Sequence, residues 1–91
     1  MQFEWDQAKA DANLRKHGVS FQEARSVFGD PLATSVVDAE YSQDEERWLT
    51  TGVSEAGNMV IVWHTNRGDR IRIIGTRRVT PEERREYESG T

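Results

Sequence analysis

Seven of the ten arginines in this 91-residue chain gather in its C-terminal part. They are Arg67, Arg70, Arg72, Arg77, Arg78, Arg84 and Arg85. A guanidinium group is permanently charged and presents a planar fork of N–H donors that matches the oxygens of a phosphate. The chain as a whole carries a net charge of −4, so this concentration does not follow from a basic composition. The arginines therefore predict a site for an anion, with phosphate as the first candidate.

The charge is divided unevenly along the chain. Residues 1–63 hold five Lys and Arg against eleven Asp and Glu, whereas residues 64–91 hold seven Arg against five Asp and Glu. Affinity for nucleic acid follows the local basic patch rather than the total charge. The alternative interpretation is a strand face whose arginines are simply solvated.

The sequence contains none of the common motifs for metal binding or nucleophilic catalysis. The chain has no Cys, its two His lie 47 positions apart, and no Gly-rich phosphate loop or Ser-His-Asp order is present. We therefore expect no metal and no cofactor, and any catalysis must rest on Arg, His and Tyr. Such a set suits metal-independent RNA cleavage, in which the 2′-hydroxyl attacks its own phosphate while cations stabilise the charge and His or Tyr moves the protons. Surfaces that only bind RNA carry the same set.

Local signals predict the elements that must position these side chains. Asp6 as N-cap and Gly18 as C-cap bound a helix over 7–17, and the Ser20–Glu23 capping box begins a second helix that runs to about Phe28. Strands are predicted over 32–39, 47–53, 59–63 and 70–78, and Thr80-Pro81 begins a short helix over 81–88. Phe3 and Trp5 alternate with Glu4 and indicate a short N-terminal edge strand.

Short connections between the four later strands predict an antiparallel meander. The fold class is thus α+β, with two N-terminal helices and a short C-terminal helix packed on a four-stranded antiparallel sheet. The sequence leaves open whether the N-terminal strand extends this sheet. Alternation within 70–78 places Ile71 and Ile73 toward the helices and Arg72 and Arg78 together on the opposite face. A bulge at Gly75 would shift this phase, so the sequence leaves open which of Arg77 and Arg78 faces the site.

Length and composition indicate one domain over residues 1–91. Hydrophobic residues make up 35% of the chain and no apolar run approaches the roughly 20 residues of a membrane span. The Met1–Asp6 segment does not have the pattern of a signal peptide. We expect a cytoplasmic protein that does not contact the membrane.

Residues along nearly the whole chain follow, in order, the pattern of one known family. In the first half these residues are Phe3, Glu4, Trp5, Asp6, Lys9, Asn13, Leu14, Lys16, His17, Gly18, Ser20, Phe21, Phe28, Asp30 and Pro31. In the second half they are Glu45, Glu46, Arg47, Gly52, Thr65, Arg67, Ile71, Arg72, Ile73, Ile74, Arg77, Arg78, Glu83, Arg84, Tyr87 and Glu88. On these residues the chain resembles the BrnT family of bacterial type II toxins, small proteins likened to the RelE ribonuclease fold.

The resemblance implies an endoribonuclease that blocks translation when free. It implies catalytic roles for Arg67, Arg72, Arg78, Tyr87 and His17. RNA contacts are expected from Lys16, Arg47, Arg70 and Arg77. It also implies a cognate BrnA-like antitoxin with a ribbon-helix-helix domain, contact with operator DNA only through the toxin–antitoxin complex, and a homodimer within a heterotetramer.

The chain departs from the family pattern in three places. This chain has Tyr41 where His is frequent, Asn66 where Glu is frequent, and Gly75-Thr76 where Ser-Ala is common. If the missing His or Glu transfers a proton, activity would be weak. Two alternatives therefore stay open: a non-catalytic toxin that acts by binding its antitoxin or another target, and a decayed homologue. The acidic residues 38–46 are either solvated or the place where a basic segment of a partner lies.

Overall fold

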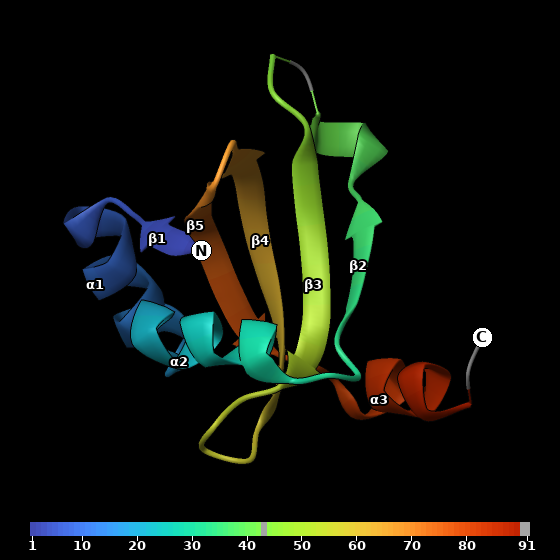
Figure 1. Cartoon of the computed structure of the whole chain (residues 1–91). Helices are drawn as coiled ribbons and strands as arrows, with labels where there is room; N and C mark the ends of the chain where they lie inside the picture. Colours follow the sequence, from blue (N-terminus) through green and yellow to red (C-terminus); the bar gives the residue numbers. More distant parts are fainter. Residues whose placement is uncertain (43, 90–91) are drawn as a thin grey trace.

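A computed structural model describes residues 1–42 and 44–89, so Gln43 of the predicted acidic connection and the last two residues of the predicted domain lie outside it. The elements follow the order β1 (Gln2–Glu4), α1 (Gln7–His17), α2 (Phe21–Ser26), η1 (Val27–Gly29), β2 (Thr34–Val37), η2 (Ala39–Tyr41), β3 (Arg47–Val53), β4 (Met59–Arg67), β5 (Arg70–Arg78) and α3 (Pro81–Glu88). Figure 1 shows one sheet with α2 and η1 crossing its front, and α1 beside β1.

The predicted ends of α1 are confirmed, whereas α2 ends at Ser26 and the predicted turn up to Phe28 is the 3-10 helix η1. The Asp6 carboxylate accepts from the Lys9 amide at 3.1 Å, and Gly18 ends α1 with a φ of 71°, a conformation that glycine adopts without a Cβ clash. Ser20 caps α2 as expected, but the Glu23 carboxylate does not complete the predicted box: it accepts from Ser54 Oγ and Asn58 Nδ2 in the β3–β4 loop. This carboxylate therefore attaches α2 to the end of the sheet.

The prediction of a four-stranded antiparallel sheet was wrong. The sheet has five strands in the order β1-β5-β4-β3-β2, and β1 pairs parallel to β5 with Phe3 opposite Ile71. The Gln2 amide donates to Asp69 O at 3.1 Å, and Phe3 packs against the core. Packing of Phe3 against the core and pairing with β5 stabilise this three-residue strand. Both contacts depend on residues that are far away in the sequence.

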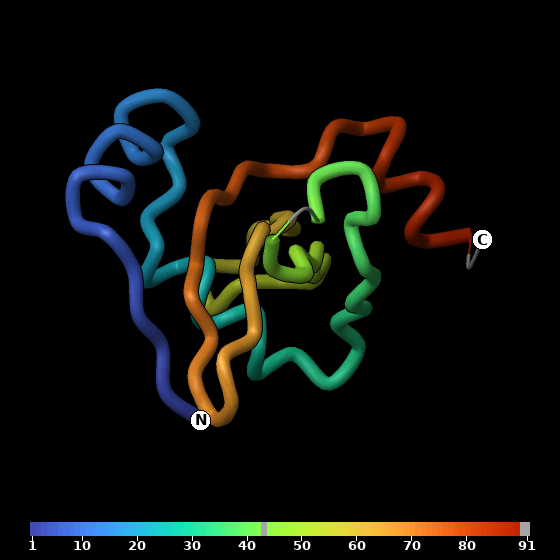
Figure 2. Tube along the Cα trace, turned by 90° about the horizontal axis from the view of Figure 1, so that it is seen from above, coloured from blue at the N-terminus to red at the C-terminus, as the bar shows by residue number. Residues whose placement is uncertain are grey.

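The core lies between the sheet and the helices, as predicted. It consists of Ala10, Val19, Phe21, Ala24, Val27, Val60, Val62, Ile71 and Ile73. Ile71 and Ile73 point toward the helices and are buried. The face of the sheet under α1 and α2 is the covered face. The opposite, open face carries no comparable helical layer within the described residues. Both Figure 1 and Figure 2 show α3 leading away from the end of β5, apart from α1 and α2.

A β-bulge decides which arginines reach the open face. Trp63 pairs with Gly75 but His64 pairs with Ile73, so Ile74 is an extra residue in β5. Arg77 therefore pairs with Ile61 and lies over the Trp63 ring, whereas Arg78 pairs with Val60, a core residue on the covered side. The prediction that Arg72 and Arg78 share a face was wrong, because the extra residue puts Arg77 on the side of Arg72.

Candidate functional site

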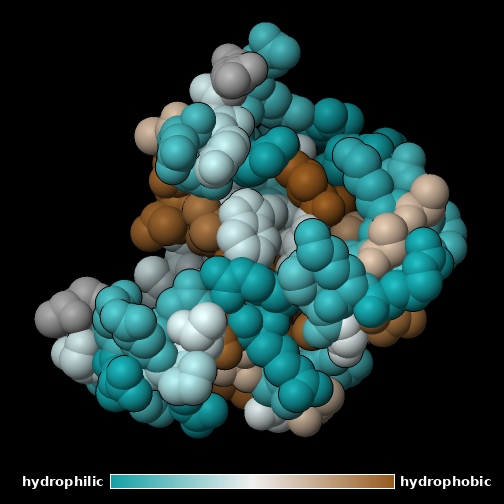
Figure 3. Space-filling view, turned by 180° about the vertical axis from the view of Figure 1, so that it is seen from behind, coloured by the Kyte–Doolittle hydropathy of each residue, from teal (hydrophilic) through white to brown (hydrophobic). Residues whose placement is uncertain are grey.

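A pocket of about 440 Å³ lies on the open face, where α1, β3, β4 and β5 each contribute a basic side chain. This arginine pocket is lined by Lys9, Tyr41, Asp44, Glu45, Arg47, Thr65, Arg67, Arg72 and Ile74. The space-filling view from behind shows this side of the molecule hollowed, with hydrophobic residues in its floor and hydrophilic residues around it (Figure 3). Three of the predicted site residues, Arg47, Arg67 and Arg72, thus meet in one cavity.

Two carboxylates neutralise part of this positive charge. Glu4 in β1 accepts from Arg72 Nη1 at 2.9 Å, and its oxygens lie 3.9 Å from Arg67 Nη1 and 3.7 Å from Arg70 Nη1. The Glu45 carboxylate accepts hydrogen bonds from both Nε and Nη2 of Arg67, each at 2.9 Å, so the two side chains form a bidentate pair. The parallel pairing of β1 with β5 places Glu4 opposite Arg72, so the N-terminal strand helps to build the site.

The ion pairs fix the protonation states of these groups. The hydrogen bonds from the Arg67 guanidinium lower the pKa of Glu45 below its usual range, and the same pair raises the pKa of Arg67. Glu45 is therefore ionised at neutral pH and can accept a proton but not supply one.

Arg77 joins the open face to the C-terminal helix. Its guanidinium lies 5.5 Å from the centroid of the Trp63 ring and donates to Glu83 through Nη1 at 2.8 Å and Nη2 at 2.9 Å. These bonds lower the pKa of Glu83 to about 2. The Thr80–Glu83 capping box is complete, so one carboxylate both begins α3 and attaches it to β5.

Other predicted site residues lie away from the pocket. Tyr87 donates its hydroxyl proton to Leu32 O at 2.6 Å and so attaches α3 to the loop before β2. Lys16 and His17 are exposed in the last turn of α1, and among the described residues no hydrogen bond or ion pair joins them to the arginines of the β4–β5 hairpin. Arg78 is exposed at the end of β5. The structure does not bring these four residues to the arginine pocket.

Sequence reasoning missed the buried His64, which is 2% exposed and packs edge-on against Phe28. The Nδ1–H group of His64 donates a hydrogen bond to Asn66 Oδ1 at 2.9 Å. In the neutral ring Nε2 then carries no proton, so it accepts a hydrogen bond from Thr50 Oγ1 at 2.6 Å. The Thr50 hydroxyl in turn accepts from Ser35 Oγ at 2.7 Å. Burial lowers the pKa of His64, against the opposing hydrogen bond to Asn66, and keeps the ring neutral. Alternation with Val60 and Val62 was the signal that could have placed His64 on the covered face.

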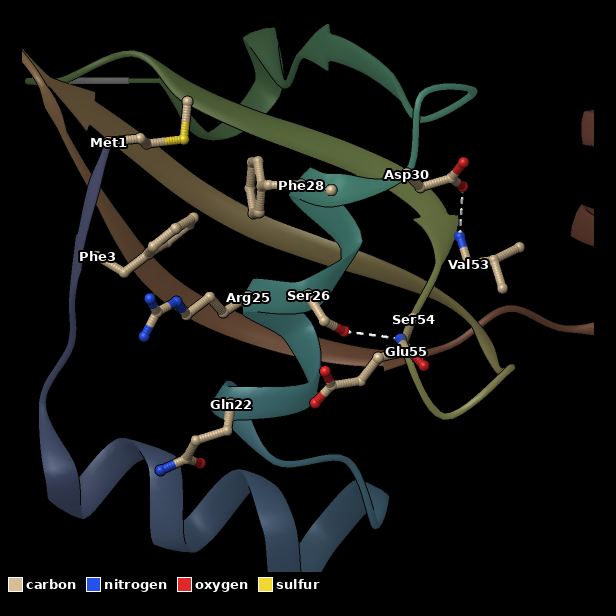
Figure 4. A pocket seen from close by; sticks show the side chains of 11 residues that line it. Met1, Phe3, Gln22, Arg25, Ser26, Phe28, Asp30, Val53, Ser54 and Glu55 are labelled. Carbon is tan, nitrogen blue, oxygen red and sulfur yellow. Dashed lines mark hydrogen bonds between the residues drawn. The ribbon is translucent and has the colours of Figure 1, made fainter.

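A larger cavity of about 890 Å³ lies on the covered side (Figure 4). Phe3 and Phe28 line it with ring centroids 5.3 Å apart, and Arg25 lies over the Phe3 ring at 5.2 Å. The Ser26 hydroxyl accepts from the Glu55 amide and Asp30 accepts from the Val53 amide, the two bonds drawn in Figure 4. Arg25 is the single basic residue among its lining side chains, so the smaller pocket fits an anion better.

Within the described residues, no three His, Asp or Glu side chains are arranged to hold a metal ion. The same residues contain no helix with the length and hydropathy that crossing a bilayer requires.

Comparisons with known proteins address the family directly. A family model described as "Ribonuclease toxin, BrnT, of type II toxin-antitoxin system" matches residues 5–83. The structure is similar to the crystal structure of the Brucella abortus ribonuclease toxin BrnT, with a TM-score of 0.67 and 19% sequence identity, over 88% of this chain and 97% of that one. No curated protein matches the sequence. Because the family model covers most of the sequence, this chain belongs to the BrnT family of ribonuclease toxins of type II toxin–antitoxin systems.

Proposed function

We propose that this toxin is a metal-independent endoribonuclease that binds RNA in the pocket of the open face and thereby inhibits translation. The observation that supports it best is the convergence of Lys9, Arg47, Arg67 and Arg72 from four different elements. Cations brought together from separate elements are held in fixed relative positions, which a pentacovalent phosphate requires.

The arginines would stabilise the charge that develops on the scissile phosphate. Arg72 uses one N–H donor on Glu4, so its remaining donors can reach phosphate oxygens. Arg77 lies on the same face beside Trp63, whose ring offers a surface on which a base can stack. The site therefore offers both a charged and an aromatic contact for a nucleotide.

Proton transfer needs an acceptor for the 2′-hydroxyl and a donor for the departing 5′-oxygen. Glu45 is ionised and lines the pocket, so it is the acceptor that the geometry favours. Tyr87 and His17 stay predictions for the donor, and Tyr87 would first have to release the carbonyl of Leu32. The catalytic role predicted for Arg78 is likewise a prediction that the strand geometry does not favour.

Cleavage of a purified, ribosome-free RNA in excess EDTA tests the proposal. Wild-type protein should produce fragments with 5′-hydroxyl and 2′,3′-cyclic phosphate ends, because the 2′-oxygen displaces the 5′-oxygen without water. Arg72→Ala should abolish cleavage, whereas Arg78→Ala, on the same strand and the covered side, should not. Melting temperatures must accompany both, since Arg72 also pairs with Glu4.

Intact RNA in the presence of folded wild-type protein would contradict the catalytic proposal. If the protein still arrests growth, the non-catalytic alternative gains, because toxicity would then come from binding alone. If it does not, the chain is a decayed homologue, consistent with Tyr41 and Asn66, which replace the His and Glu that are frequent in the family.

The remaining parts of the proposal concern the cell. A cognate antitoxin partner follows from the family. We further propose that this antitoxin is BrnA-like with a ribbon-helix-helix domain, that operator DNA is bound only through a heterotetrameric complex, and that the toxin is cytoplasmic. Similarity to the RelE fold stays a prediction.

A further inference from the structure

The strand β2 is a free edge of the sheet. In the order β1-β5-β4-β3-β2 it has one strand neighbour, and Figure 1 shows its outer side beside no other element. An edge strand presents unpaired N–H and C=O groups to which another chain can add. Natural edges are commonly protected by Lys or Pro, but the sequence of β2 is Thr-Ser-Val-Val.

The ladder with β3 identifies which backbone groups are unpaired. The Asp38 amide donates to Arg47 O at 2.7 Å, so Asp38 points toward β3. Hydrogen-bonding direction alternates along an antiparallel strand, so Val36 and Thr34 also point inward. The N–H and C=O groups of Ser35 and Val37 therefore face outward, as a partner strand requires.

Exposed hydrophobic side chains concentrate around this edge. Seven large ones stay exposed among the described residues, and four of them lie in or beside β2: Leu32, Val36, Val37 and Tyr41. Val36 and Val37 point to opposite faces of the sheet and are 55% and 40% exposed. A partner on one face would cover only one of them, whereas a strand added at the edge contacts both.

The segment after β2 is strongly acidic. Asp38, Glu40, Asp44, Glu45 and Glu46 lie between β2 and β3 without a basic residue among them. Glu45 pairs with Arg67, but no ion pair neutralises the carboxylates of Asp38 and Glu40 within the described part of the chain. A segment that lies along β2 and continues past Val37 would therefore gain from carrying Lys or Arg there.

We propose that an extended, basic segment of the cognate antitoxin adds to β2 as a sixth strand. This inference rests on the proposed function for the existence of the partner, and it names the surface that the partner uses. Backbone hydrogen bonds to Ser35 and Val37 supply the register, and contact with Val36 and Val37 supplies apolar burial. The basic residues lie against Asp38 and Glu40. The bound segment does not occupy the arginine pocket.

Replacement of the outward amide tests this mode of binding. Val37→Pro removes an N–H that β3 does not use, and Pro is tolerated at such edge positions. Val37→Ala is the matched control, since it shortens the side chain and keeps the amide. With co-expressed antitoxin from the neighbouring gene, Val37→Pro should weaken binding by at least about tenfold, and Val37→Ala by much less. Equal affinity of the Pro and Ala variants would overturn the proposal.

Hydrogen exchange of the wild-type complex provides a readout that does not depend on the folding of any variant. The amides of Ser35 and Val37 should exchange fast in the free toxin and slowly in the complex. Unchanged exchange at both, in a complex that does form, would overturn the strand-addition proposal while the proposed function stands. Failure of the antitoxin to bind wild-type toxin would contradict the proposed partner, and with it this inference, while the ribonuclease proposal stands.

Two further outcomes separate this partner from others. Asp38→Asn with Glu40→Gln should weaken antitoxin binding at low salt and less at high salt, because exposed charges are screened. If the free toxin instead forms a dimer that Val37→Pro dissociates, the edge binds a second copy of the chain and the antitoxin proposal is wrong. Light scattering at several concentrations measures this.

Discussion

The two faces of the sheet are built from the same strands but do opposite things with polar groups. On the covered face, β4 buries His64 in a hydrogen-bonded chain that runs through Thr50 to Ser35, and the ring stays neutral. On the open face, β5 presents Arg72 and Arg77 as partly exposed cations. The difference shows that strict alternation along a strand decides, for each residue in turn, whether its side chain lies in the core or at the site. A single extra residue, Ile74, decides which arginine faces the site.

The largest effect should come from the covered face. Phe21 is fully buried and packs edge-on against Trp5, with ring centroids 5.9 Å apart. Phe21→Ala should lower the free energy of unfolding by about 3–5 kcal/mol, because it removes a large ring and leaves a cavity. Denaturant unfolding measures this. A loss below about 1 kcal/mol would mean that the helices do not form the core described here.

Removal of one arginine from the open face should affect activity more than stability. Arg77→Ala should reduce RNA cleavage on the order of a hundredfold, the effect of losing one preorganised donor to the transition state. Glu83→Gln is the control, since it breaks the same ion pair but keeps the cation. If both variants lose activity equally, Arg77 acts by attaching α3 and does not contact RNA.

The buried histidine should make stability depend on pH. The pKa of His64 is lowered in the folded state from its ordinary 6.5, so below pH 6.5 the unfolded chain binds the proton first. Stability from this group is complete above about pH 6.5 and falls as the pH drops toward the folded pKa. His64→Gln should make the free energy of unfolding depend less on pH below about pH 6.5 than it does in the wild-type protein. Denaturant unfolding at several pH values measures this, and an unchanged pH dependence in the variant would contradict the assignment.

The smallest expected effect concerns Thr65, in the wall of the arginine pocket. Thr65 Oγ1 is buried in the pocket wall without a hydrogen-bond partner in the described structure. Thr65→Val should leave the unfolding free energy unchanged or raise it by up to about 1 kcal/mol, because an unpaired buried hydroxyl is costly. If cleavage falls while stability does not, the hydroxyl contacts RNA. A clear loss of stability would show that Thr65 has a partner in solution.

Local chemistry made much of the fold predictable. Asp6 and Gly18 bound α1, and the predicted ranges 47–53 and 70–78 match β3 and β5. Each of these depends on caps and turn residues within a few positions. The parallel pairing of β1 was not predictable in the same way, since Phe3 and Ile71 are brought together only by the complete sheet.

The candidate site was predictable in type but not in arrangement. The choice of Arg47, Arg67 and Arg72 agrees with the pocket, because charge concentration is visible in a sequence. The choice between Arg77 and Arg78 depended on a bulge one residue before Gly75, and no local signal fixed its position. Glu4 as a counter-charge and the His64 chain depend on contacts between strands, which composition does not reveal.

The pairing of β1 with β5 also sets the order of events while the chain is being made. Glu4 and Arg72 are 68 positions apart, so the N-terminal strand leaves the ribosome long before its partner exists. Contacts of such long sequence separation form late and slow folding. The cavity, which takes Lys9 from α1 and Arg72 from β5, can close only after most of the chain has emerged. The arginine pocket is therefore assembled only when synthesis of the chain is nearly complete.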